Sequence, residues 1–210
     1  MIGVGKTFFV EAAKKSAPEK MMVVQEPHES NPYLADFYMD PSRYGFACQL
    51  QFLSSRASEL KRTLAEFDND KADLISDRSI AEDRVFAQVL HEEDVLTDRD
   101  LELYDQFYKH IEETLPEHHT PDVYVFLDVT VETCLGRIQK RGREFETSID
   151  RSYLERLQHF YEEFLERVAE TALVVRVSWE EFKDPVDTII EVMRLYQTKK
   201  TGMVMLPSHV

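Results

Sequence analysis

The first residues of the chain have the types and spacing of a phosphate-binding loop: Gly3, Val4, Gly5, Lys6 and Thr7. They correspond to the second half of the pattern G-x-x-x-x-G-K-[ST]. In that pattern backbone N–H groups surround phosphate oxygens, the lysine contacts the β- and γ-phosphates, and the hydroxyl reaches Mg²⁺. The first glycine of the pattern, and the buried strand that normally leads into it, would both fall before Met1. The alternative interpretation is a glycine-rich start to a surface helix.

Charged side chains also stand where two strands are expected to end. Residues 21–24 are an apolar run followed closely by Glu26, and the run over 74–79 contains Asp77 and Arg78. Open parallel α/β sheets bind ligands at the carboxyl ends of their strands, so these groups are candidates for a site. An aspartate at such a position often holds the metal of a bound nucleotide. An N-cap of the following helix is the alternative for Asp77.

A third candidate is a basic segment in an acidic protein. Four cations fall between Arg137 and Arg143, whereas the whole chain has 25 Lys and Arg against 40 Asp and Glu. A basic helix end stabilised by the helix dipole would explain the cluster without any function. Gly142 should end the helix, however, and this leaves arginines on a segment that is able to close over phosphates.

Composition limits the classes of protein and partner. A chain of 210 residues with 43% hydrophobic residues suits one domain with one sizeable core. The formal charge of −15 disfavours a broad surface for nucleic-acid polymers or anionic membranes. We find no run near the ~20 apolar residues that cross a bilayer, and no signal peptide. With Cys48 and Cys134 expected as buried, reduced thiols in helices, we predict a soluble, cytoplasmic protein.

Alternating helix and strand signals predict an α/β fold with a parallel sheet. Strands are expected over 21–24, 74–79, 122–129 and 173–178. Helices are expected over 6–15, 31–39, 40–67, from about 83, 97–115, 131–141, 153–168 and 186–196, whereas 198–210 shows no usable period. The apolar stripe of 153–168 is interpreted as core or dimer interface and not as a ligand site. Gln49 and Arg56 lie seven residues apart and so share one helix face.

Several of these motifs occur together, in order, in one known family. The blocks are GVGKT, QEP, NPYLADFYMDPSRY, FACQLQFLSSR, DRSIAEDRVFA, and RIQKRGREFE followed by YLERL. From Gly3 to about Leu165 the chain resembles the deoxyribonucleoside kinases, and most closely the bacterial deoxyadenosine/deoxyguanosine kinases. The resemblance implies a three-layer P-loop kinase fold with about five parallel strands, of which the first is expected to be absent here. It also implies a homodimer, a kinase domain over 1–197 with a lid at about 137–147, and a tail over 198–210.

The resemblance implies phosphoryl transfer from ATP to the 5′-hydroxyl of a deoxynucleoside in nucleotide salvage. Glu26 would be the general base, and Arg78 would orient the 5′-oxygen. Residues 3–7 would hold the donor phosphates, and Thr7 and Asp77 would bind Mg²⁺. The lid arginines Arg137, Arg141 and Arg143 would stabilise the negative charge on the transferring phosphoryl group.

The resemblance also implies how the nucleoside is recognised. Tyr38 and Glu146 would bind the 3′-hydroxyl, and Tyr38 would crowd the 2′ position and so favour deoxyribose. Gln49 would pair with the base edge, because a carboxamide donates and accepts side by side. Phe86 would stack on the base. Arg56 and Asp83 would pair beside Gln49, a combination that favours purines, with deoxycytidine as a further candidate.

Two other functions were weighed. A non-catalytic subunit of the same fold would explain an incomplete phosphate loop, but it would have no chemical need for the complete set of charged residues. A nucleoside monophosphate kinase would need a basic site for the acceptor phosphate, and the carboxylate of Glu26 at that strand end disfavours it. The sequence has no N-K-x-D motif, so a switch GTPase is disfavoured as well.

Overall fold

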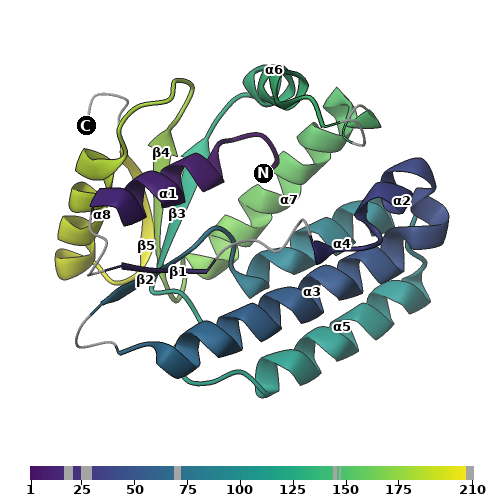
Figure 1. Cartoon of the computed structure of the whole chain (residues 1–210), viewed down its shortest axis with the longest axis horizontal. Coiled ribbons are helices and arrows are strands. Elements are labelled where there is room, and N and C mark those ends of the chain that lie inside the picture. The colour runs from purple at the N-terminus through teal and green to yellow at the C-terminus, as the bar shows by residue number, and fades with distance from the viewer. Residues whose placement is uncertain (17–20, 25–29, 69–71, 144–145, 147, 207–210) are drawn as a thin grey trace.

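The computed structural model describes residues 1–16, 21–24, 30–68, 72–143, 146 and 148–206. Helices and strands alternate along the chain, as the apolar patterns predict (Figure 1). The strands are β1 (Met21–Val24), β2 (Asp73–Ser76), β3 (Val123–Asp128), β4 (Leu173–Ser178) and β5 (Gly202–Leu206). The helices are α1 (Lys6–Ser16), α2 (Leu34–Met39), α3 (Pro41–Glu66), α4 (Asp83–Glu92), α5 (Asp98–Glu113), α6 (Val131–Arg141), α7 (Arg151–Val168) and α8 (Val186–Thr198), with a short 3-10 helix, η2 (Ile80–Glu82).

The described strands are all parallel and form two sheets, with the orders β1-β2 and β3-β4-β5. In the first sheet Val24 pairs with Ser76, and in the second Asp128 pairs with Ser178. Strand ends that carry ligand-binding groups in open α/β folds are therefore aligned within each sheet. The parallel α/β class is confirmed. A single sheet one strand short of five was expected, whereas the described residues form five strands in two sheets.

The fifth strand lies in the tail, where no regular element was predicted. Gly202 pairs with Leu173 at the start of β4, and its N–H donates to the carbonyls of Ala169 and Ala172. The run over 203–206 is as apolar as residues 21–24, so the local signal of a buried strand was present, but it was not separated from the rest of the tail, which shows no usable period. The tail therefore extends the second sheet.

A groove separates the two sheets. Among the described strands, β2 pairs only with β1, and β3 pairs with β4, so one edge of each faces the groove. A cavity of about 340 Å³ lies there, lined by Leu74 and Ile75 of β2, Tyr124 and Val125 of β3, and Met1. The amine of Met1 is buried, and this desolvation lowers its pKa well below the ordinary value. The groove therefore leaves an apolar gap in the centre of the fold.

Helices cover the strands on both sides. Figure 1 shows α1 and α8 on one side of the strands and α3, α4, α5 and α7 on the other, which is the expected three-layer arrangement. The apolar stripe of α7 is core, because Leu154, Leu157 and Phe164 are buried in the cluster that includes β3 and β4. No helix in the described part of the chain has the length and apolar character needed to span a membrane.

Local sequence explains where the main helices begin and end. Thr97 and Asp100 form a reciprocal capping box at α5, and Asp40 accepts from the N–H of Arg43 at the start of α3. Gly142 ends α6 with a φ of 68°, a conformation that favours glycine. Both cysteines are buried in helices with free thiols, and burial raises the pKa of Cys48 to about 12.

Candidate active site

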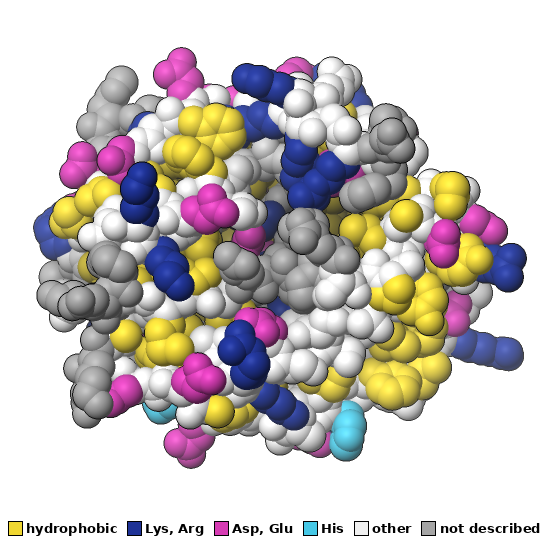
Figure 2. Space-filling view, in the orientation of Figure 1, with side chains coloured by type: hydrophobic (Ala, Val, Ile, Leu, Met, Phe, Trp, Pro, Cys, Tyr) yellow, Lys and Arg dark blue, Asp and Glu magenta, His cyan; other side chains and the backbone are white. Residues whose placement is uncertain are grey.

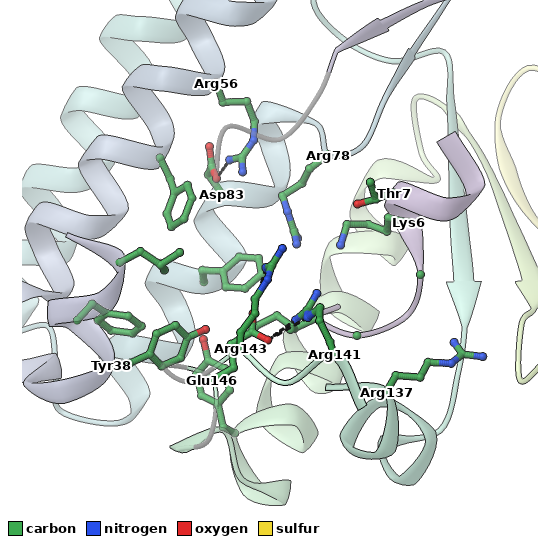
Figure 3. Close-up of a pocket in the computed structure, with 18 of the residues that line it drawn as sticks. Lys6, Thr7, Tyr38, Arg56, Arg78, Asp83, Arg137, Arg141, Arg143 and Glu146 are labelled. Atoms are coloured by element: carbon green, nitrogen blue, oxygen red, sulfur yellow. Dashed lines mark hydrogen bonds and ion pairs between the residues drawn. The ribbon is translucent and has the colours of Figure 1, made fainter. Parts of the chain in front are cut away.

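A cavity of about 510 Å³ brings most of the predicted site residues together (Figure 3). It lies between the loop before α1, the helices α2 to α4, and the segment that follows α6. The predicted residues that line it are Gly3, Gly5, Lys6, Thr7, Tyr38, Gln49, Arg56, Arg78, Asp83, Phe86, Arg137, Arg141, Arg143 and Glu146. Val4 and Asp77 line the groove between the sheets instead. Glu26 lies outside the described residues.

The loop before α1 needs glycine at two positions. Gly3 and Gly5 have φ values of 78° and 98°, and residues that carry a side chain rarely adopt such values. A Cβ on Gly3 would lie 2.8 Å from the carbonyl oxygen of Cys134, and one on Gly5 would lie 2.5 Å from the ring of Phe182. The loop leads directly into α1, which begins at Lys6. Helix N-termini present free N–H groups and a positive dipole end, so this loop suits an anion such as phosphate.

Thr7 and Asp77 meet beside this loop. The Thr7 hydroxyl donates to Oδ2 of Asp77 at 2.8 Å, and Lys6 Nζ lies 3.8 Å from Oδ1. Oδ1 is buried and makes no hydrogen bond to a described residue. Asp77 caps no helix, because Ser79 is the N-cap of η2. A carboxylate oxygen available beside a hydroxyl suits Mg²⁺, which keeps several waters and binds through one or two protein oxygens plus phosphates.

Arg78 is buried at the boundary between the cavity and the groove, with 5% of its surface exposed. Its Nη1 donates to the hydroxyl of Tyr161 and lies 3.6 Å from Oε2 of Glu82. The guanidinium also stacks over the ring of Phe86, with its carbon 4.6 Å from the ring centre. The side chain is therefore fixed by three contacts from two helices and η2.

The lid arginines meet at Glu146. Arg141 donates to Oε2 of Glu146 through Nε and Nη2, at 3.0 and 2.6 Å, and Arg143 donates to Oε1 at 3.3 Å. Glu146 is 5% exposed, and Tyr38 lies close to it in Figure 3. The predicted sugar ligand and two predicted phosphate ligands are thus in direct contact.

Arg137 has a different environment from the other two arginines. Its guanidinium donates to the carbonyl oxygens of Val4, Trp179 and Glu180 at 2.8 to 2.9 Å. It also lies 4.3 Å from the centre of the Phe182 ring. Arg137 therefore ties α6 to the phosphate-binding loop and to the segment after β4, besides lining the cavity.

The other end of the cavity contains the residues predicted to read a base. Gln49 and Arg56 both reach it from α3, as their seven-residue spacing predicts, and both are buried. Arg56 forms an ion pair with Asp83, and each side chain is 3% exposed. Phe86 lines the same space. This part of the cavity therefore combines the amide of Gln49, the Arg56–Asp83 ion pair and the aromatic ring of Phe86.

The charge of the cavity contrasts with that of the protein. Its described lining has seven Lys and Arg side chains and two carboxylates, although the chain has a formal charge of −15. Figure 2 shows blue Lys and Arg side chains gathered around the hollow beside α6. A local positive field in an acidic protein is what a small, highly charged anion such as a nucleotide requires.

Sequence reasoning missed several residues of this site. Tyr153 and Tyr161 were both assigned to the apolar stripe of α7, and Glu82 was quoted only within a sequence block. Tyr153 lines the cavity, and burial raises its pKa well above the ordinary value. Phe182 lines it from a segment for which no element was predicted. A tyrosine on an apolar stripe is the signal that was available, since a buried hydroxyl needs a partner.

Comparisons with known proteins agree with this geometry. A family model described as deoxynucleoside kinase matches residues 1–199. The chain is 35% identical over 185 residues to a deoxyadenosine kinase of Dictyostelium discoideum, covering 88% of this chain and 72% of that protein. It is 33% identical over 165 residues to a deoxyadenosine/deoxycytidine kinase of Bacillus subtilis, covering 78% and 73%.

A solved structure is similar as well. The deoxyadenosine kinase from M. mycoides, determined with the products dCMP and a flexible dCDP, superposes with a TM-score of 0.77 at 28% identity. The match covers 94% of this chain and 95% of that one. Sequence and fold thus point to one family.

Proposed function

The chain belongs to the deoxynucleoside kinase family, and we propose that it prefers the purine deoxynucleosides deoxyadenosine and deoxyguanosine, with deoxycytidine as a secondary substrate. The reaction is the transfer of a phosphoryl group from ATP to a deoxynucleoside. The 5′-hydroxyl oxygen attacks the γ-phosphorus, the bond to the bridging oxygen of ADP breaks, and the hydroxyl proton passes to a base.

One observation carries the proposed role of the cavity. Lys6, Thr7 and the lid arginines lie on one side of the cavity and the Arg56–Asp83 pair lies on the other (Figure 3), and Gln49 and Phe86 line the same cavity. Arg78 stands between them. A nucleoside whose base lay on Gln49 would therefore direct its 5′-oxygen towards Arg78 and the donor phosphates. Such positioning supplies most of the catalysis in phosphoryl transfer, because little covalent chemistry is left to the protein.

Each part of the transfer has a candidate residue. Glu26 would accept the 5′-hydroxyl proton, and Arg78 would hold the 5′-oxygen. Lys6 and the N-terminus of α1 would bind the donor phosphates. Arg141 and Arg143 would neutralise charge on the transferring group, to which a single arginine contributes about 10³-fold or more in related enzymes.

Mg²⁺ would be held by the Thr7 hydroxyl and the Asp77 carboxylate, whose available Oδ1 supports this assignment. When bound, the ion would neutralise charge on the β- and γ-phosphates. The described residues contain no group of three or more His, Cys, Asp or Glu side chains suited to a metal. A metal site with few protein ligands is typical of Mg²⁺ bound with a nucleotide.

The proposed purine preference rests on the base end of the cavity. The Gln49 amide presents a donor and an acceptor side by side, so it matches the amino and ring-nitrogen edge of adenine or, flipped, the keto and N–H edge of guanine. The buried Arg56–Asp83 pair beside it limits the room for the methyl group of thymine. Tyr38 and Glu146, which line the same cavity, would bind the 3′-hydroxyl.

We also propose that the protein is a cytoplasmic homodimer that acts in nucleotide salvage. Its two free, buried cysteines are in keeping with a reducing compartment. Leu103 and Phe107 of α5 are exposed by 41% and 44% and give that helix an apolar surface suited to association.

The test of the proposed function is the variant Glu26→Gln, which keeps size and hydrogen bonding but removes the proton acceptor. We expect wild-type protein with Mg-ATP and deoxyadenosine to yield the 5′-monophosphate, as measured by ³¹P NMR. The variant should lose most turnover, about 10²-fold or more, and still bind deoxyadenosine in calorimetry. An active Glu26→Gln variant would remove Glu26 as the base.

A further inference from the structure

The most constrained polar contact of the cavity joins residues from distant parts of the chain. Tyr161 of α7 is 2% exposed and belongs to the core cluster, and its ring lies among those of Phe126 and Phe164. Its hydroxyl accepts from Arg78 and donates to Oε2 of Glu82 at 3.0 Å. A phenylalanine would fill the same core position and keep the ring contacts, including the one with Phe86, so this substitution removes only the hydroxyl and its hydrogen bonds.

The two carboxylate oxygens of Glu82 have different hydrogen-bond partners. Oε1 accepts from the N–H and the hydroxyl of Ser79, at 3.0 and 3.2 Å, and closes the capping box of η2. Oε2 accepts from Tyr161 and faces the Arg78 guanidinium. The carboxylate therefore fixes the backbone immediately after Arg78 and the hydroxyl that Arg78 contacts. It also gives a buried cation a nearby negative charge, which burial of a charge requires.

We propose that Tyr161 and Glu82 are positioning residues that hold the Arg78 guanidinium at the 5′-oxygen subsite. The Tyr161 hydroxyl holds the guanidinium by a hydrogen bond from the core side, and the Phe86 ring packs against the guanidinium on the other side. The inference rests on the proposed function, in which Arg78 contacts the acceptor oxygen. Displacements of about 1 Å among reacting groups cost up to about 10²-fold in rate. A contact that fixes Arg78 therefore affects turnover without touching the substrate.

The variant Tyr161→Phe tests this with little change in packing. Loss of the hydroxyl should lower kcat about tenfold and leave the KM for ATP unchanged, because Arg78 acts in the transfer step and not in donor binding. Tyr104→Phe is the matched control. Tyr104 is fully buried, and its hydroxyl makes no hydrogen bond to a described residue. The control should keep wild-type kcat and KM, and a wild-type kcat in Tyr161→Phe would overturn the proposal.

A double-mutant cycle separates positioning from general damage. If Tyr161 acts through Arg78, Tyr161→Phe should lower kcat in the wild type but not in an Arg78→Lys background. Equal losses in both backgrounds would contradict the proposal. The same cycle measured by urea midpoints should show that removal of the hydroxyl costs less stability once Arg78 is replaced, whereas additive midpoint shifts would contradict the contact itself. If wild-type protein transferred no phosphate, the proposed function would fail, and the urea cycle alone would decide on Tyr161.

Discussion

At the scale of single residues, Arg56 and Asp83 are the pair on which base choice should depend. They form a buried ion pair in the cavity that Gln49 also lines, and each compensates the charge of the other. Removing both avoids the cost of about 3–5 kcal/mol that follows when one buried charge loses its partner. We expect Arg56→Ala with Asp83→Ala to shift preference towards thymidine, because the pair no longer limits room for the 5-methyl group.

The measurement is kcat/KM for deoxyadenosine, deoxyguanosine, deoxycytidine and thymidine in the double variant and in wild type. Asp83→Ala alone should lower the unfolding midpoint more than the double variant does, because it leaves the buried Arg56 charge without its partner. Unchanged relative values among the four nucleosides would refute the role of the pair in specificity.

Asp150 gives a pH-dependent prediction for α7. Its carboxylate accepts from the N–H of Tyr153 and from the hydroxyl of Ser152, and these hydrogen bonds lower its pKa. A depressed pKa stabilises the fold at neutral pH, and this stabilisation is lost as the pH falls through the folded-state pKa. Asp150→Ala should cost about 1 kcal/mol at pH 7 and progressively less at acidic pH.

The check on Asp150 is urea unfolding at several pH values. Asp150→Asn should keep most of the stability at every pH, since asparagine also caps helices. A cost in Asp150→Ala that did not change with pH would contradict the contribution of the carboxylate.

At the scale of elements, the end of α6 should control the lid. Gly142 adopts a φ of 68°, and the nearest atom to an added Cβ would be 4.0 Å away, so the cost of a side chain there is backbone strain alone. Gly142→Ala should destabilise the helix end by about 1 kcal/mol. It should also raise the KM for ATP, because Arg141 and Arg143 flank the residue.

Gly136 supplies the matched control within the same helix. It lies in the helical interior, and an added Cβ would meet nothing within 4 Å. Gly136→Ala should therefore stabilise the protein by up to about 1 kcal/mol and leave the KM for ATP unchanged. The comparison uses thermal melting and initial rates. Equal effects of the two substitutions would contradict the account of the lid.

At the scale of the whole molecule, the groove between the sheets leaves a cavity in the fold. The facing edges of β2 and β3 and the apolar lining fit one more parallel strand, whose carboxyl end would lie at the buried Met1. We expect an N-terminal extension of about five apolar, β-branched residues followed by glycine to occupy the groove, because doubly covered parallel strands are apolar on both faces. A gain of about 3 kcal/mol would raise Tm by about 6–12 °C.

An extension of the same length with alternating aspartate and proline is the control, since it cannot pair or be buried there. Differential scanning calorimetry of the two fusions and of the original chain measures the effect. The same Tm for both extensions would show that the groove does not accept a strand.

The positions of most helices and strands were predictable, because they depend on the local pattern of apolar residues in the sequence. Apolar runs located β1 to β4, and the stripe of α7, interpreted as core or dimer interface, is buried in the core. The shared cavity of Gln49, Arg56 and Arg78 followed from helix spacing and from the resemblance to a known family. The division of the strands into two sheets did not follow, since strand order depends on contacts between distant segments.

The missed features have a common physical reason. β5 forms by pairing with β4, and Tyr161 reaches Arg78 across 83 positions of sequence. Arg137 is predicted to bind the phosphoryl group, and its contacts with the carbonyls of Val4, Trp179 and Glu180 were not predicted. In each case the partner is distant in the sequence and is brought close by the tertiary structure. The type of a residue shows whether its side chain is polar or apolar, but it does not identify the partner.

The most direct test of the central claim is the rate of phosphate transfer from Mg-ATP to each of the four deoxynucleosides. We predict turnover of the 210-residue chain, with the highest kcat/KM for deoxyadenosine or deoxyguanosine and the lowest for thymidine. Transfer with thymidine as the best substrate would contradict the base assignment. A folded chain that transferred phosphate to none of the four, with or without the added strand, would contradict the account as a whole.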